Sequence, residues 1–140
     1  MVFRQPILAL FYCQNVPESS EQDRQALEKK YGQRIRLFPL PCSGRLEPVH
    51  LLRALEEFAD SVYLVTCPED ACRYFEGNQR AKKRLARTQD IIAGIGLENE
   101  RLGIVIGSRE NPKPLVTLVQ EILEKVSQIP PSPVLNSVHP

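Results

Sequence analysis

Four cysteines are the residues of this chain whose type and placement are best suited to chemistry. Cys13, Cys42 and Cys67 each end an apolar run typical of a β-strand, and Cys72 follows the third of them within five residues. Thiolates are soft ligands, and four of them complete the shell of one zinc ion or of the two irons of a 2Fe-2S centre. The carboxyl ends of neighbouring parallel strands share one edge of an open α/β sheet, where such folds bind ligands. The pattern therefore predicts one shared metal or cluster site.

Spacing alone does not choose the metal. The pattern Cys-x28-Cys-x24-Cys-x4-Cys matches no zinc ribbon or finger, in which the ligands come as two close pairs. Taken singly, each cysteine also has a structural interpretation as a small buried hydrophobic residue at a strand end. Three successive strands that end in cysteine favour the joint site over that interpretation.

Two other chemistries are compatible with parts of the sequence. The segment 67–73 has the Cys-x4-Cys-Arg spacing of low-molecular-weight protein tyrosine phosphatases. A phosphate cradle needs unobstructed amides, whereas Pro68 has no N–H and the carboxylates of Glu69 and Asp70 repel an anion. A flavin in a flavodoxin-like fold is the second alternative, but the loop 14–20 contains no glycine for a phosphate-binding turn. We rank both below the cluster.

The elements that must position the cysteines alternate between strand and helix along the chain. Such alternation predicts βαβ units and a parallel sheet, and right-handed crossovers place helices on both faces. We therefore expect a flavodoxin-like α/β fold, an open parallel sheet of four or more strands. The expected strands are 6–13, 35–42, 61–67 and 102–108.

Capping residues and apolar periodicity mark four helices between and after these strands. Ser19 or Ser20 caps the first helix, which runs to about Tyr31 and stops at Gly32. Pro48 opens the second helix. The expected apolar stripe of this second helix is Val49, Leu52, Leu55, Phe58 and Ala59. The third helix has its recurring positions at Ala81, Leu85, Thr88 and Ile92, and it ends at Gly94 and Gly96. The last helix has its apolar positions at Leu115, Leu118, Val119, Ile122 and Val126.

The length of the chain predicts a single domain, and its first apolar run bears on the compartment in which that domain works. The chain has 140 residues, 25% of them charged, and a formal net charge of +1, which gives no reason to expect a nucleic acid or an anionic membrane as partner. The first apolar run is too short for a membrane span or a secretory leader, so we expect a cytoplasmic protein. Residues 1–129 form the predicted α/β domain, and the Pro-rich residues 130–140 form a tail expected to be extended or disordered.

Several motifs together resemble the delta subunit of methyl-viologen-reducing hydrogenase. They are the segment Cys42 to Pro48 (CSGRLEP), the segment Cys67 to Asn78 with its Cys-x4-Cys and Gly-Asn, then Arg84, and then Gly96 to Leu102 (GLENERL). The resemblance implies an iron–sulfur subunit that passes electrons between a hydrogenase or similar donor and the flavin subunit of heterodisulfide reductase-like complexes. It covers about residues 6 to 126.

This resemblance implies that Cys13, Cys42, Cys67 and Cys72 hold a 2Fe-2S cluster. Two neighbouring residues have both a structural and a functional interpretation. Gly44 is typical of a turn, and its backbone would also let N–H groups approach the cluster sulfurs. Arg45 is either a surface arginine or a counter-charge to the cluster. The chain departs from the family pattern at Val16, where a second cysteine is usual, and at Ala71 and Arg73 beside the last cysteine.

We therefore expect an electron-transfer subunit of an oxidoreductase complex, since no acid, base or nucleophile for transforming a substrate stands out. The alternative is a docking or scaffold module whose cysteine site is empty or filled by zinc. A basic run on the third helix, Arg80, Lys82, Lys83, Arg84 and Arg87, is either a solvated face or a surface that docks to an acidic subunit.

Overall fold

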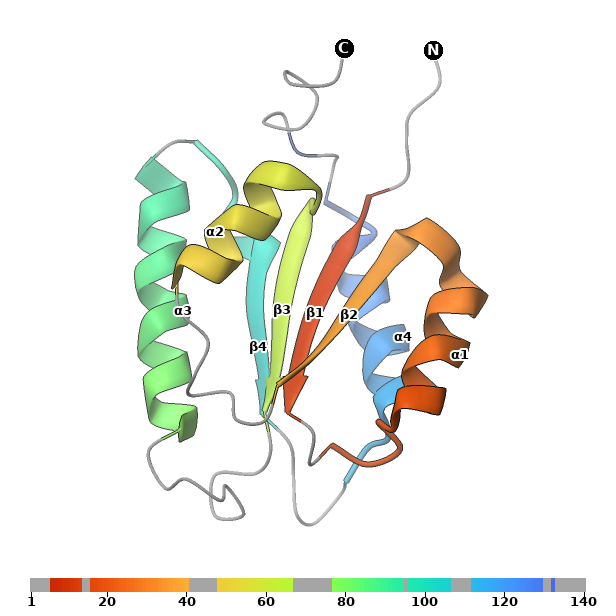
Figure 1. The fold of residues 1–140 in the computed structure, drawn as a ribbon. Helices are drawn as coiled ribbons and strands as arrows, with labels where there is room; N and C mark the ends of the chain where they lie inside the picture. The colour runs from red at the N-terminus through yellow and green to blue at the C-terminus, as the bar shows by residue number, and fades with distance from the viewer. Residues whose placement is uncertain are drawn as a thin grey trace, which may run out of the picture.

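A four-stranded parallel sheet forms the centre of the molecule (Figure 1). The structure is a computed structural model that describes residues 6–13, 16–40, 48–66, 77–94, 96–106, 112–129 and 132. The strands are β1 (Leu8–Cys13), β2 (Ile35–Leu40), β3 (Ser61–Thr66) and β4 (Leu102–Ile106). Their order is β2-β1-β3-β4, which agrees with the first four strands of the flavodoxin-type order. The predicted open parallel α/β sheet is confirmed.

Helices cover both faces of this sheet, as predicted (Figure 1). The helices α1 (Glu21–Tyr31) and α4 (Leu115–Val126) pack on one face, and α2 (Pro48–Glu57) and α3 (Gly77–Gly94) pack on the other. Two short 3-10 helices, η1 (Gly32–Arg34) and η4 (Asn99–Arg101), precede β2 and β4. Among the described residues, no helix is both long and apolar enough to cross a membrane.

Alternating side chains of β1 belong to two separate hydrophobic cores. Leu8, Leu10 and Tyr12 belong to the core under α1 and α4, whereas Ala9 and Phe11 contact the core under α2 and α3. This alternation is what a strand with two covered faces requires, because successive side chains point to opposite sides. Residues of β3 are buried at every position, so β1 and β3 form the interior of the fold.

The predicted helix signals agree with the structure at three of the four helices. Ser20 caps α1 in a reciprocal arrangement with Asp23, and Gly32 ends the helix with a φ of 62°, a conformation that glycine adopts at little cost. The apolar positions predicted for α4 are all buried, and so are Leu85, Thr88 and Ile92 of α3.

The predicted apolar stripe of α2 is confirmed at Leu55 and at Ala59 just beyond the helix, which are buried, while Leu52 and Phe58 pack partly buried against the same core. The stripe is wrong at Val49, which is 52% exposed, and it omits the buried residues Leu51 and Ala54. The segment holds apolar residues at several overlapping helical spacings, so periodicity alone admits two neighbouring stripes. Packing against α3 and the sheet selects the stripe that contains Leu51.

Candidate functional site

The carboxyl ends of β1, β2 and β3 meet at one edge of the sheet (Figure 1). Cys13, the last residue of β1, pairs with Leu40, the last residue of β2. One residue earlier, Tyr12 pairs with Val65, which precedes Thr66 at the end of β3. The chain reverses its direction of winding between β1 and β3, and in open α/β sheets ligands bind at such a switch point.

Of the four candidate ligands, Cys13 is the one that the structure describes. Its side chain is 2% exposed and belongs to the hydrophobic core that β1 shares with α4. Val16 belongs to the same core. Val16, the position at which the family that the sequence resembles usually has a second cysteine, is therefore an apolar packing residue beside the end of β1.

Hydrogen bonds connect residues 16–19, which precede α1, with both β1 and α4. The Val16 N–H donates to the Cys13 carbonyl at 3.0 Å, and the Ser19 hydroxyl donates to the Val16 carbonyl at 2.6 Å. The Leu115 N–H at the start of α4 donates to the Pro17 carbonyl at 3.0 Å. These contacts fix Cys13 and Val16 relative to both α1 and α4.

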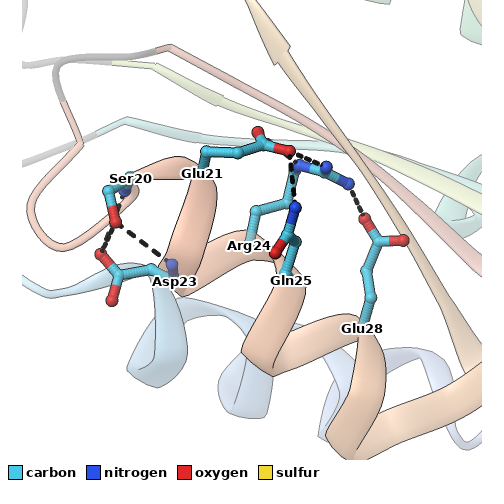
Figure 2. A network of polar contacts seen from close by, with 6 residues as sticks. All are labelled: Ser20, Glu21, Asp23, Arg24, Gln25 and Glu28. Atoms are coloured by element: carbon cyan, nitrogen blue, oxygen red, sulfur yellow. Dashed lines mark hydrogen bonds and ion pairs between the residues drawn. The ribbon is translucent and has the colours of Figure 1, made fainter.

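A polar network stiffens α1, the helix that follows this loop (Figure 2). Ser20 and Asp23 exchange hydrogen bonds at the start of the helix. One turn later, Arg24 bonds to both Glu21 and Glu28, and its hydrogen bond is the main reason that the pKa of Glu21 lies below its usual value. Burial raises the pKa of Tyr12 on the neighbouring strand, an effect that the Arg24 charge opposes. The Arg24 charge is therefore neutralised within its own helix.

The other predicted site residues lie outside the described residues. Cys42, Gly44 and Arg45 fall in 41–47, and Cys67 and Cys72 fall in 67–76. Within the described ranges, no three His, Cys, Asp or Glu side chains are grouped so that they could hold a metal ion. The structure thus tests the position of Cys13 and of the strand ends that precede the other ligands, and the four-cysteine site stays a prediction.

Sequence reasoning missed a buried polar cluster at the opposite edge of the sheet, centred on Asp60. The Asp60 carboxylate accepts hydrogen bonds from the N–H of Ile7 at 2.7 Å and from the N–H of Ser132 at 2.6 Å. Its backbone carbonyl accepts from Arg101 Nη1 at 3.1 Å, and Arg101, which is fully buried, also bonds to Glu98. Asp60 therefore joins the start of β1, the start of β4 and the C-terminal tail.

Ser132 is the one residue of the predicted tail that the structure describes, and it is fully buried. The tail thus contacts the domain at this residue, while the predicted boundary near residue 129 stays a prediction. Three buried atoms around Asp60 have no hydrogen-bond partner among the described residues, namely Ser61 Oγ, Ser132 Oγ and Arg101 Nη2. No sequence pattern signals this cluster, because its members are separated in the chain and stand in unrelated segments.

Comparison with known proteins identifies the family. A family model described as the delta subunit of methyl-viologen-reducing hydrogenase matches residues 7–130. The iron-sulfur subunit of the F420-non-reducing hydrogenase vhu of Methanocaldococcus jannaschii is 24% identical over 91% of this chain and 96% of that protein. The A-type subunit of the Ferredoxin:CoB-CoM heterodisulfide reductase of Methanosarcina mazei is 34% identical over 72% of this chain, which corresponds to 13% of that protein. Because the family model spans nearly the whole domain, the chain belongs to the methyl-viologen-reducing hydrogenase delta subunit family.

Proposed function

We propose that this chain is the iron–sulfur electron-transfer subunit of a complex that joins a hydrogenase or similar donor to a heterodisulfide reductase-like flavoprotein. The observation that carries the proposal is the position of Cys13. It ends β1, between the strands whose ends are followed in sequence by Cys42 and by Cys67. Relatives named as iron–sulfur subunits of hydrogenases support the same conclusion.

The proposed ligands are Cys13, Cys42, Cys67 and Cys72, which together supply the four thiolates that a 2Fe-2S cluster needs. A bound cluster of this kind accepts and releases one electron at a time. Burial of Cys13 among apolar side chains suits a metal-bound thiolate, whose charge the metal compensates, and equally a neutral thiol; it excludes only a free thiolate. Those side chains also exclude water from the sulfur.

Two further residues are assigned supporting roles in the proposal. Gly44 would let backbone N–H groups approach the sulfur atoms, and Arg45 would offset the negative charge of four thiolates. Val16 takes no part as a ligand, because its side chain is apolar and packs in the core. Cys13, Cys42, Cys67 and Cys72 still supply the four ligands that a 2Fe-2S cluster needs.

The partner assignment rests on the heterodisulfide reductase relatives of the A type. In these proteins a segment similar to this chain forms 13% of a longer polypeptide. A domain that is a separate chain in one protein and part of a larger chain in another is expected to work beside the rest of that larger chain. We place the complex in the cytoplasm, where cysteines stay reduced and available to a cluster.

A second candidate function is a docking module whose cysteine site is empty or filled by zinc. The burial of Val16 at the position of a usual cysteine favours it. Anaerobic purification followed by iron and acid-labile sulfide analysis separates the two candidates. We expect about two irons and two sulfides per chain.

The matched variants are Cys13→Ser, which removes a proposed ligand, and Val16→Ala, which removes only packing beside it. We expect Cys13→Ser to lose the visible absorption while its far-ultraviolet circular dichroism is unchanged, and Val16→Ala to retain the iron. A colourless native protein with one zinc per chain supports the docking module instead. Iron that survives equally in both variants contradicts the ligand assignment of Cys13.

A further inference from the structure

Two basic side chains lie on the exposed face of α3. Lys83 and Arg87 are exposed and lie one helical turn apart. Within the part of the chain that the structure describes, neither forms an ion pair or hydrogen bond, and Asp90, one turn beyond Arg87, does not pair with it. Like charges at this spacing repel each other, so the isolated domain gains nothing from them.

The ends of α3 also lack the charges that stabilise a helix. Its first turn contains no acidic residue and its last turn contains no basic residue, although acids at the start and bases at the end complement the helix dipole. On α1, by contrast, the first turn is acidic, the last turn is basic, and Arg24 bonds to two carboxylates (Figure 2). The arrangement on α3 is therefore not explained by the stability of that helix.

An exposed apolar residue continues the same face. Ile91 lies one turn beyond Arg87 and is 43% exposed, and only Val49 shares this property among the large hydrophobic residues that the structure describes. An arginine and an apolar side chain on one surface are typical of protein interfaces. A polyanion such as nucleic acid is instead bound by a broad basic surface, which a chain of net charge +1 does not supply.

The position of α3 places one end of this face toward the carboxyl edge of the sheet. The helix begins at the carboxyl edge of the sheet and runs back along it (Figure 1). Lys83 lies about 9 Å along the axis from Gly77, and Arg87 about 15 Å, at 1.5 Å per residue. Lys83 is therefore the residue of this face that lies nearest to the carboxyl edge of the sheet, whereas the Cys13 side chain packs on the opposite face of the sheet, in the core under α1 and α4.

We propose that Lys83, Arg87 and Ile91 form the docking surface for an acidic, partly apolar patch on the heterodisulfide reductase A-like protein. This inference rests on the proposed function and names the surface through which the partner is bound. The two basic residues steer association, and Ile91 is buried on contact.

The test measures association and dissociation rates between the native chain and the heterodisulfide reductase A-like protein from the same organism. The variant Lys83→Glu/Arg87→Glu should associate about tenfold more slowly at low salt, and the difference should shrink as salt is raised. Ile91→Ala should instead speed dissociation with little salt dependence. The matched control is Lys29→Glu/Lys125→Glu, which makes the same change of net charge on exposed residues of α1 and α4 and should bind like the native chain.

The possible failures are distinguishable. If the native chain binds and both α3 variants bind equally well, the docking surface is wrong while the proposed function stands. If the native chain shows no binding to this protein, both this inference and the proposed partner are wrong, whereas the iron analysis still decides whether a cluster is held. Salt-sensitive binding to vesicles with anionic phospholipid that only Lys83→Glu/Arg87→Glu abolishes would overturn the choice of a protein partner.

Discussion

The ring of Tyr63 on β3 occupies the space that a side chain at Gly103 on β4 would need. A Cβ at position 103 would come within 2.4 Å of Tyr63 Cε2, which is closer than carbon atoms approach in folded proteins. Tyr63 and Gly103 are register partners in the sheet. This contact therefore limits how closely β4 can lie beside β3. β3 is buried at every position and is followed in the sequence by Cys67.

We predict that Gly103→Ala destabilises the domain by about 1–3 kcal/mol, because either the ring or the strand must move. The control is Gly94→Ala at the end of α3, where nothing lies within 4 Å of the added Cβ; it should be neutral or slightly stabilising. Urea unfolding of both variants checks the prediction. Equal stabilities of the two would show that Tyr63 yields without cost.

The Asp60 carboxylate should be essential to the fold in a way that its neighbour Ser61 is not. Both Asp60 oxygens accept from backbone N–H groups, so in Asp60→Asn the new NH2 group must face one of these donors. We expect a loss of about 1–3 kcal/mol. Ser61→Ala removes a buried hydroxyl that has no partner among the described residues, and this variant should be neutral or stabilising. Thermal unfolding distinguishes the two; a harmless Asp60→Asn would contradict the assigned bonds.

Ser132 allows its backbone and side chain to be tested separately. Its N–H donates to Asp60 Oδ1 at 2.6 Å, whereas its buried Oγ bonds to no described residue. Ser132→Pro removes the N–H and should cost about 1–3 kcal/mol, while Ser132→Ala keeps the N–H and should cost nothing. If removal of residues 130–140 leaves the free energy of unfolding unchanged, Ser132 does not anchor the tail.

The contrast between α4 and Asp60 shows what the sequence can predict. Leu115, Leu118 and Ile122 recur at helical spacing, and local periodicity was enough to predict their burial. The bond between Asp60 and Ser132 joins residues 72 positions apart, and a serine between two prolines carries no periodic signal. Such a contact arises only from the tertiary arrangement, which composition and spacing do not encode locally.

The place of Cys13 at the carboxyl end of β1 was predictable for a different reason. The apolar run that Cys13 ends predicted the strand, and alternating strand and helix signals predicted its parallel neighbours. The burial of Leu51 in place of Val49 on α2 was not predictable, because both residues begin acceptable apolar stripes. Only packing against α3 decided between them.

Alkaline pH should weaken the fold through two tyrosines. Burial raises the pKa values of Tyr12 and Tyr63 above 10.0, and Glu100 adds to the effect at Tyr63. A group whose pKa is raised by folding contributes its full stabilisation below its pKa in the unfolded chain. This contribution is lost as the pH rises through its pKa in the folded protein. The native protein should therefore lose stability above about pH 10, and Tyr12→Phe/Tyr63→Phe should lose less. Denaturant midpoints between pH 8 and pH 11 measure this difference; parallel curves would exclude these groups as the cause.

Restoring a cysteine at position 16 tests whether Val16 marks an incomplete site. Val16 packs in the same core as Cys13 and bonds to its carbonyl, so Val16→Cys places a thiol beside the proposed ligand at a cost below about 1 kcal/mol. If Cys13, Cys42, Cys67 and Cys72 complete the cluster, iron should stay at about two per chain. Val126→Cys, in the same core at the other end of α4, controls for the added thiol. Iron that rises only in Val16→Cys would show that the native set of four is insufficient and would favour the docking module.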